Sequence, residues 1–356
     1  MSSDCRFGIR YVIPSYMLER IELNGPEELR TAAAEALKRS ESFRGERAAV
    51  QSQIASGELA RPQEPVSDPA QVCRRVFDAG GWESLPGSLV RSEGDPPTGD
   101  TAADEAYAGA GLTYFFFRDE YGRNSIDDRG MGMDATVHYG TRFNNAFWTG
   151  RQMVYGDGDD VLFTRFTKNL DIMAHELSHG VIQYEANLEY EYQSGALHES
   201  FADVFGALVK QRSFGQDAKE ADWLIGADVL IGGSYAMRSL KAPGTAYLNH
   251  SVLGDDPQGA TMDEYQDVGY YNDRGGVHLN SGIPNHAFYL AAMELGGFAW
   301  QRAGRIWYGA LCHHLQRDAD FQTAAGVLVQ VAREEFGPGS LEEKAVAKGW
   351  REVKIL

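Results

Sequence analysis

Cysteine is scarce in this sequence, and its scarcity excludes two kinds of site. The 356 residues contain three cysteines, Cys5, Cys73 and Cys312. Three widely separated thiols cannot form a disulfide framework, and none belongs to a CxxC pair of the kind that holds a metal through sulfur. We therefore interpret them as buried or incidental thiols.

Long apolar runs are missing as well. Nowhere do about 18 apolar residues follow one another, as a membrane-spanning helix requires. The N-terminal stretch MSSDCRFGIRYVIPSYML is interrupted by Asp4, Arg6 and Arg10, so it lacks the continuous apolar centre of a secretory signal peptide. We expect a soluble protein that stays in the cytoplasm or is exported without a signal peptide.

Basic residues are the third deficit. The chain has 33 Lys and Arg against 51 Asp and Glu, which gives a net charge of −18. A negative surface opposes contact with phosphate backbones and anionic membranes, so we expect neither a nucleic-acid partner nor a membrane partner. Eight basic and eight acidic residues balance within residues 1–50, so the whole net charge belongs to residues 51–356.

Composition divides the chain into four parts and predicts an α+β fold. Residues 1–50 contain an apolar segment, YVIPSYMLERI, and then the helical pattern PEELRTAAAEALKRSESF. Residues 51–71 are polar and proline-rich, which is typical of an exposed linker. Residues 72–166 contain short apolar runs between turn signals, among them LTYFFFRDEYG, and this predicts a β-rich region. Residues 167–356 are dominated by helical periods.

The most informative motif is HELSH, within a predicted helix that begins near residue 167. It places His175 and His179 four residues apart, with Glu176 beside the first. Positions i and i+4 lie on one helical face, so the two imidazoles can converge on one zinc ion while the glutamate flanks a water site. The alternative is a solvated helix with two incidental histidines.

A catalytic zinc ion needs a third protein ligand and an open fourth position. One known pattern has a third histidine six residues after the second, but Glu185 stands there, and Ile182 replaces the expected glycine, so that class is excluded. Glu199 lies on a second apolar helix, after a predicted break at Ser194–Gly195. Asp203 follows one turn later, where a carboxylate can orient a ligating imidazole. Two carboxylates among apolar residues need partners, although an ExxxD pair is otherwise a common solvated face.

From about residue 72 onward the chain resembles the thermolysin family of zinc metalloproteases. The resemblance is carried by HELSH, GALHESFADVFG, NDRGGVHLNSGIPNHAFYL, NNAFWTGRQMVYGDGD, MRSL and GRIWY. The segment YVIPSYMLERI is similar to the short pro-region of protealysin-type members, except that Ser15 replaces the second of two prolines. The resemblance implies a two-lobed fold, with a β-rich N-terminal lobe, a helical C-terminal lobe and the active-site helix between them.

The resemblance also implies the chemistry. The chain is expected to hydrolyse peptide bonds in peptide or protein substrates, with one catalytic zinc ion and Glu176 as general base. The His2Glu ligand set is thermolysin's own, so it is taken from the family. It assigns zinc binding to His175, His179 and Glu199. The remaining expected roles are intermediate stabilisation by His278 and Tyr190, orientation of His278 by Asp273, and support of the zinc ligands by Asp203, Asp171 and His198.

Substrate contacts follow from the same resemblance. Asn145 and Ala146 match the edge-strand positions that bind the substrate backbone, a form of strand addition. Arg238 matches the arginine that binds a substrate carbonyl. It lies beside an expected apolar pocket formed by Phe163, Phe166, Ile172 and Met237. The resemblance therefore implies cleavage before bulky hydrophobic residues.

The N-terminal part is expected to inhibit the protease. As a pro-region, residues 1–50 would place an extended segment, Ile13–Leu18, in the substrate cleft. The inhibitory residues are Ile13, Pro14, Ser15, Tyr16 and Met17. The linker 51–71 would contain the maturation site. Two alternatives remain open: a catalytically silent binding protein with this segment locked in the groove, and a precursor in which Cys5 ligates zinc as a thiolate.

Two departures from the family pattern bear on the metals. His198 replaces the asparagine that commonly precedes the glutamate ligand, so a ring nitrogen would have to support a zinc-binding histidine. Asp171 and Asp222 match the paired calcium site of thermolysin, but three further positions are Lys210, Leu224 and Ala227. Calcium prefers six to eight oxygen ligands, and an ammonium could take a cation's place. We expect the double calcium site to be lost.

Overall fold

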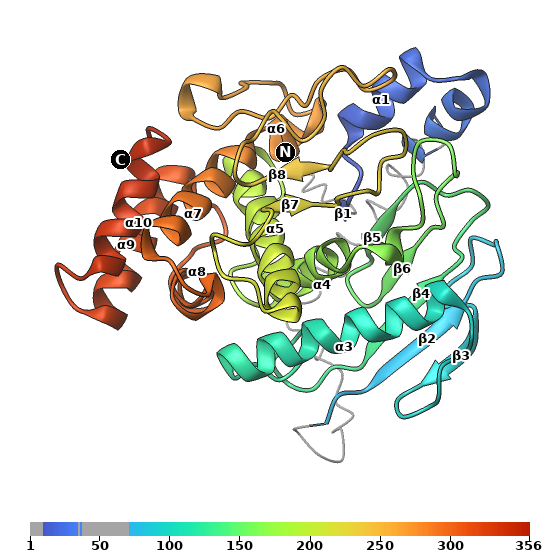
Figure 1. The fold of residues 1–356 in the computed structure, drawn as a ribbon, viewed down its shortest axis with the longest axis horizontal. Helices are drawn as coiled ribbons and strands as arrows, with labels where there is room; N and C mark the ends of the chain where they lie inside the picture. Colours follow the sequence, from blue (N-terminus) through green and yellow to red (C-terminus); the bar gives the residue numbers. More distant parts are fainter. Residues whose placement is uncertain (1–9, 35, 38–70) are drawn as a thin grey trace, which may run out of the picture.

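A six-stranded sheet and a group of helices meet at helix α4, Leu170–Tyr184 (Figure 1). The computed structural model describes residues 10–34, 36–37 and 71–356. The sheet has the strand order β1-β5-β6-β4-β2-β3. Its strands are β1 Arg10–Tyr11, β2 Arg74–Asp78, β3 Ser88–Ser92, β4 Met133–Val137, β5 Ala146–Trp148 and β6 Met153–Tyr155. Strands β2, β4 and β6 pair in parallel, and the remaining pairs are antiparallel.

A long helix, α3 Thr101–Tyr121, interrupts the β-rich region and packs against β2 and α4. Asp100 caps its N-terminus by accepting the N–H of Ala103, and Gly122 ends it in the left-handed region at φ 73°. The run LTYFFFRDEYG therefore belongs to this helix, and the prediction of a short apolar β run there is wrong. Buried residues occupy most of its circumference, so the sequence shows little helical period.

The rest of the chain is largely helical, as predicted. Two short strands, β7 Leu224–Ile225 and β8 Arg238–Ser239, form a separate antiparallel pair. Three short 3-10 helices occur at Phe166–Lys168, Met262–Glu264 and Ala299–Gln301. The remaining α-helices are α5 Tyr192–Phe214, α6 Asp273–Asn280, α7 Gly282–Leu295, α8 Ala303–His313, α9 Phe321–Phe336 and α10 Leu341–Glu352. The predicted α+β architecture, β-rich and then helical, is confirmed.

Helices α4 and α5 approach closely because α5 has a glycine at the contact. A Cβ atom on Gly206 would lie 2.6 Å from the carbonyl oxygen of Asp171 and 3.3 Å from the Cβ of His175. A larger residue would therefore push the helices apart. This close packing brings the carboxylates of α5 to the histidines of α4.

The N-terminal segment crosses the edge of the sheet and then turns into a helix. Strand β1 pairs with β5, with Arg10 opposite Trp148 and Tyr11 opposite Phe147. Helix α1, Ser15–Asn24, follows Pro14, and residues 27–34 are helical too. The extended conformation predicted for Ile13–Leu18 therefore ends at Pro14, and Ser15, Tyr16 and Met17 are helical. The proline favours this boundary because its fixed φ suits the start of a helix.

None of the helices in the described ranges combines the length and apolar character needed to cross a bilayer. The predicted maturation linker, residues 51–71, lies outside the described residues except for Gln71, and so does Cys5. The helix predicted over residues 26–43 is described only at residues 27–34 and 36–37, which are helical.

Candidate active site

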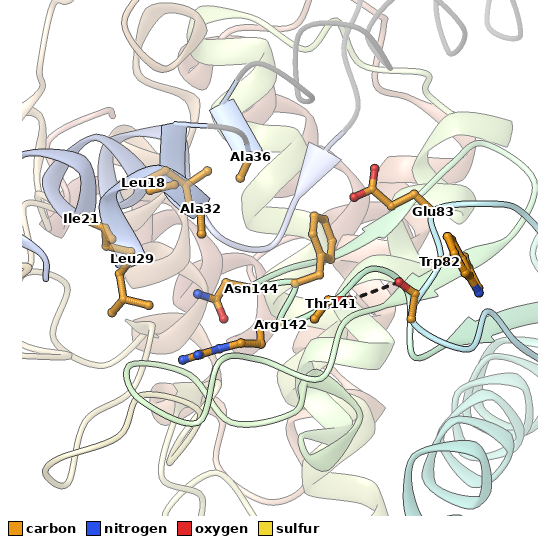
Figure 2. Close-up of a pocket in the computed structure, with 13 residues that line it drawn as sticks. Leu18, Ile21, Leu29, Ala32, Ala36, Trp82, Glu83, Thr141, Arg142 and Asn144 are labelled. Atoms are coloured by element: carbon orange, nitrogen blue, oxygen red, sulfur yellow. Dashed lines mark hydrogen bonds between the residues drawn. The ribbon is translucent and has the colours of Figure 1, made fainter. Parts of the chain in front are cut away.

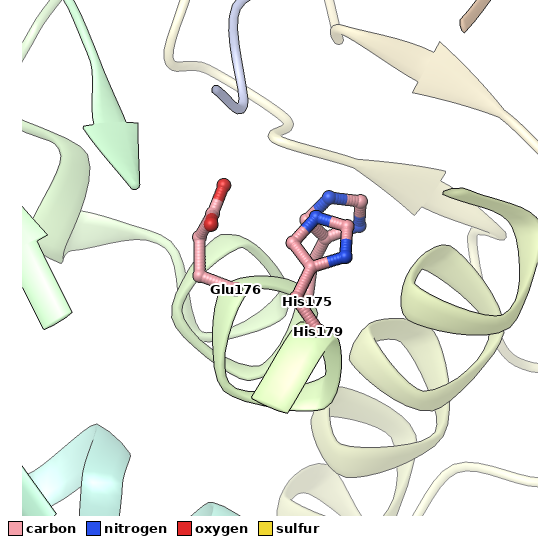
Figure 3. A group of neighbouring side chains, drawn as sticks. All are labelled: His175, Glu176 and His179. Carbon is pink, nitrogen blue, oxygen red and sulfur yellow. The ribbon is translucent and has the colours of Figure 1, made fainter. Parts of the chain in front are cut away.

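Helix α4 presents His175, Glu176 and His179 to the interior, and all three side chains are fully buried. One potential ligand atom from each lies within 4.8 Å of the others. Figure 3 shows the two imidazole rings next to each other on one side of the helix, with the Glu176 carboxylate beside them. The i, i+4 spacing therefore has the geometric result that the sequence predicts.

Helix α5 adds a third acceptor to the pair of histidines. The carboxylate of Glu199 lies 3.4 Å from His175 Nε2 and 3.5 Å from His179 Nε2. A tetrahedral zinc ion bound at about 2.1 Å holds neighbouring ligand atoms roughly 3.4 Å apart. The three side chains thus have the spacing of a His2Glu zinc site.

A buried network holds the first histidine in place. Asp203 Oδ1 lies 2.8 Å from His175 Nδ1, which leaves Nε2 directed at Glu199. The Arg238 guanidinium donates two hydrogen bonds of 2.8 Å to the same carboxylate, and the Asn285 amide donates a further one of 2.9 Å. Asp203 is therefore fully partnered although it is buried, as a stable buried charge must be.

The carboxylates and imidazoles of the cluster shift one another's pKa values. Burial alone would raise the pKa of Glu199, but His278, His175 and Arg238 lower it to about 2. Burial alone would lower the pKa of His175, but Asp203 and Glu199 raise it to about 9. Both shifts show that carboxylate charge persists in this interior and stabilises positive charge beside it.

Tyr190 and His278 also contact the Glu199 carboxylate. The Tyr190 hydroxyl donates to Glu199 Oε1 and lies 3.2 Å from His278 Nε2. Asp273 accepts the backbone N–H of His278 and contacts its Nδ1, both at 2.7 Å. The ring of His278 is thus oriented by Asp273, so its Nε2 points at the site.

The general-base candidate is held by the sheet. The backbone N–H of Trp148, in β5, donates to Glu176 Oε2 at 3.0 Å. This contact was not predicted from the sequence, because a backbone donor has no side-chain signature. The Asn285 amide was also missed, although it lies in the string SGIPNHAF directly after the segment of His278.

The predicted substrate-binding residues contact the N-terminal segment. Val12 N–H donates to the carbonyl of Ala146 at 3.1 Å, and Ile13 N–H donates to Asn145 Oδ1 at 2.9 Å. Arg238 Nη1 donates to the Val12 carbonyl at 3.4 Å. Strand β1, Arg10–Tyr11, therefore pairs with the edge of the sheet, and hydrogen bonds of Val12 and Ile13 continue the contact, which is how extended peptides bind sheet edges.

The four residues of the predicted apolar pocket are buried in one hydrophobic cluster with Val12 and Ile13. Gly226 lies between two of them: a Cβ there would come within 2.9 Å of Met237 and 3.2 Å of Ile172. The phenyl rings of Phe163 and Phe166 have centroids 6.0 Å apart. These side chains therefore belong to the same hydrophobic core as Val12 and Ile13.

The structure also gives contacts for His198 and Asp171, two of the predicted supporting residues. The ring of His198 lies 5.1 Å from that of His179, and its Nδ1 lies 3.4 Å from the Leu188 carbonyl. Asp171 contacts Lys210 Nζ at 2.9 Å, and the same ammonium lies 2.9 Å from Asp222 and donates to the carbonyl of Leu224. The lysine therefore occupies the space among the predicted calcium ligands.

Comparison with known proteins agrees with this geometry. Residues 68–183 match the family described as "Thermolysin metallopeptidase, catalytic domain", and residues 186–355 match "Thermolysin metallopeptidase, alpha-helical domain". An extracellular metalloprotease of Pectobacterium carotovorum subsp. carotovorum is 50% identical over 348 residues, which cover 97% of this chain and 96% of the relative. Protease PrtS of Photorhabdus sp. (strain Az29) is 44% identical over 349 residues, which cover 97% and 91%.

A solved structure is similar over almost the whole chain. The precursor of protealysin, a metalloproteinase from Serratia proteamaculans, superposes with a TM-score of 0.85 at 44% sequence identity. The match covers 98% of this chain and 100% of that one. The similarity therefore includes the N-terminal segment as well as the two lobes.

Proposed function

The chain belongs to the thermolysin family of metallopeptidases, and on that premise we propose that it is a zinc-dependent neutral endopeptidase made as an autoinhibited precursor. The proposal depends above all on one observation, the convergence of His175, His179 and Glu199 next to Glu176. A silent binding protein has less support, because the chain retains each of the chemical groups that hydrolysis requires and its relatives are named as proteases.

The donor set fits one zinc ion. His175 Nε2 and Glu199 Oε2 are buried, and neither has a hydrogen-bond partner in the described part of the chain. Buried polar atoms without such partners are costly, and a cation between these two would satisfy both. We propose that His175, His179 and Glu199 are the zinc ligands. The mix of imidazole nitrogen and carboxylate oxygen is a common zinc donor set.

We propose the following roles in the reaction for the residues of the site. Bound zinc supplies a Lewis acid that polarises the scissile carbonyl and makes water more acidic. Glu176, held by the N–H of Trp148, takes the proton from the attacking water and passes it to the leaving amine. Tyr190 and His278 donate hydrogen bonds to the oxyanion as charge develops there. Asp273 and Asp203 orient His278 and His175.

The contacts of the N-terminal segment support a binding mode for substrate. We propose that a substrate strand pairs with β5 as residues 10–13 do, with one carbonyl on Arg238 and one N–H on Asn145. Phe163, Phe166, Ile172 and Met237 would accept the bulky apolar side chain that follows the scissile bond. Pocket burial of such a side chain is worth roughly 1.5–3 kcal/mol.

We further propose the division of the chain into residues 1–50 as pro-region, 51–71 as linker with the maturation site, and lobes of residues 72–166 and 167–356. The match to a protealysin precursor supports a zymogen. One relative is named extracellular, which supports export, the second of the two locations expected from the sequence. The position of Lys210 supports the absence of a thermolysin-type double calcium site.

Two measurements test the function. A quenched peptide with Phe or Leu after the scissile bond should be cleaved at neutral pH, and a zinc chelator should abolish cleavage reversibly. The purified chain should lose about 45–70 residues, whereas a Glu176→Ala variant should bind zinc and stay full length. If the Glu176→Ala variant matured in pure form at the normal rate, self-processing would be ruled out. If the matured chain without the substitution were inert, the silent binding protein would be favoured.

A further inference from the structure

Residues 273–276, at the start of α6, have an unusual backbone. All four have positive φ values, among them 53° at Arg274 and 82° at Gly275. A Cβ atom on Gly275 would lie 2.3 Å from the ring of Tyr192, so the segment passes too close to that ring for a side chain at this position. Glycine adopts the left-handed region readily, whereas a long side chain is disfavoured there. Arg274 therefore has a conformation that an arginine does not favour.

The side chain of Arg274 lies beside the candidate active site. Its guanidinium carbon is 5.6 Å from the centroid of the Tyr190 ring, a distance at which a cation is attracted to an aromatic face. The hydroxyl of Tyr190 donates to Glu199 and lies 3.2 Å from His278 Nε2. Arg274 therefore places a positive charge next to one of the proposed oxyanion donors.

Arg274 is half-buried, yet it has no acidic partner in the part of the chain that the structure describes. Acidic residues are plentiful in this chain, 51 against 33 basic ones. Other half-buried arginines use them: Arg74 pairs with Glu93 at 2.6 Å, and Arg302 pairs with Glu342. A guanidinium offers five N–H donors, so those of Arg274 are available to a carboxylate from another molecule.

A second arginine with a positive φ differs from Arg274 in its contacts. Arg142, at φ 54°, lines a cavity of about 410 Å³ opposite Leu18 and Ile21 (Figure 2). Its Nη2 donates to the carbonyl of Asp159 at 2.9 Å, so its side chain joins two parts of one loop. Arg274 makes no such hydrogen bond to the described residues. A disfavoured conformation without a structural bond points to a functional role.

We infer that Arg274 binds an acidic side chain of the substrate, so that peptides with Asp or Glu within two residues of the scissile bond are preferred. The inference rests on the proposed function, because it names a substrate class for the same site. A planar guanidinium matches a carboxylate and can donate two parallel hydrogen bonds to it.

The position of Arg274 sets the limit of two residues. Tyr190 is proposed to hold the oxyanion of the scissile bond, and Arg274 contacts the ring of that tyrosine. An extended peptide advances only about 3.3 Å per residue, so the carboxylate must come from a residue near the bond. Because the net charge of −18 opposes the approach of acidic peptides, the attraction must be a local one.

The test compares peptides that differ only by Glu or Gln at one position within two residues of the scissile bond. On the matured full chain, kcat/KM for the best-placed Glu peptide should exceed that of its Gln partner about tenfold. Arg274→Gln should remove this preference with little change for the Gln peptide, and Arg274→Lys should keep part of it. Arg305→Gln removes the same charge from an exposed position on α8 and should leave the preference unchanged.

Binding separates this inference from the proposed activity. The full chain with Glu176→Gln, cut at a foreign protease site in the linker 51–71, should bind the Glu peptide about tenfold more tightly than the Gln peptide. Fluorescence anisotropy of a label on each peptide measures this ratio. Any N-terminal segment left in the site competes equally with both peptides, so the ratio is unaffected. If neither peptide were cleaved but the ratio held, only the proposed function would fail.

Two results would overturn the inference. One is equal binding of the Glu and Gln peptides, and the other is the same loss of preference in the Arg305→Gln and Arg274→Gln variants. Thermal unfolding adds a check on the backbone argument. Arg274→Asn should unfold at no lower temperature than the unsubstituted chain, because asparagine tolerates the left-handed region. A lower unfolding temperature would make Arg274 a structural residue and would contradict the inference.

Discussion

Helices α4 and α5 carry two acidic clusters whose negative charge is balanced in different ways. Asp171 and His175 are one turn apart on α4, and Glu199 and Lys210 are about three turns apart on α5. At the first cluster Lys210 places its ammonium between Asp171 and Asp222. At the second, Glu199 faces two imidazoles, and no lysine is among the partners that the structure gives it there.

The difference shows how one pair of helices can combine a structural ion pair with the proposed metal site. A buried carboxylate needs a cation. Asp171 has one built into the chain, so this contact stabilises the fold without any external ion. At Glu199 we propose that an ion taken from solution supplies the positive charge, and its binding would then add to stability. The following predictions test this contrast.

The largest effect should come from Glu176, which borders the proposed metal site without being a ligand. Glu176→Gln should lower kcat at least about 1,000-fold, because it removes the general base. Its zinc content, measured by elemental analysis, should stay at one ion per chain. Loss of the metal together with activity would instead make Glu176 part of the binding site.

The next largest effect should come from the support of the zinc ligands. Asp203→Asn should weaken zinc affinity about 10- to 100-fold in a chelator competition assay, because Asp203 orients His175. Asp222→Asn makes the same change at the other cluster and should leave zinc affinity unaltered. Equal losses in the two variants would mean that the clusters are not independent.

Replacing Lys210, which pairs with Asp171, should lower the stability of the fold. Lys210→Met keeps the length of the side chain but leaves the buried Asp171 without its ammonium, so we expect the free energy of unfolding to fall by about 3 kcal/mol. Lys219→Met, at an exposed lysine, should change it by less than about 0.5 kcal/mol. Denaturant titration of the zinc-loaded forms measures both. A neutral Lys210→Met would show that this cation adds nothing to stability.

The smallest effect on stability is expected at a third cluster, which lies closer to solvent. His138 lies 2.9 Å from Asp157 and 3.2 Å from Asp100. The hydrogen bond to Asp157, opposed by partial burial, raises the pKa of His138 to about 9. The stabilisation is therefore complete below the unfolded-state pKa near 6.5 and is lost as the pH rises through about 9.

Solvent screens this third pair, because about a quarter of the His138 side chain is exposed. We therefore expect the free energy of unfolding to fall by about 1 kcal/mol, which is less than the pKa shift of His138 alone would imply. His138→Asn should lack this decline when unfolding is measured from pH 6 to 10. An identical pH profile in the variant would contradict the assignment.

The side chains of the proposed zinc site could largely be identified from the sequence, because each belongs to a recognisable pattern. The HELSH spacing fixes two imidazoles on one face of any helix. Glu199 and Asp203 stand out as carboxylates on an apolar helix. The predicted break at Ser194–Gly195 was less accurate, since α5 begins at Tyr192 and both residues lie in its first turn.

Other features could not be predicted, for physical reasons. Helix α3 is buried on several sides, so its aromatic run has no polar face to reveal a helical period. Trp148 acts through its backbone N–H, and such groups are the same in every residue.

Strand β1 also has a consequence for the solubility of the newly made chain. An open edge strand pairs readily with other chains and promotes aggregation. Residues 10 and 11 cover the edge of β5, and they leave the ribosome long before β5 does. The segment proposed to inhibit the protease is thus also placed to keep its sheet from assembling with neighbouring molecules until folding is complete.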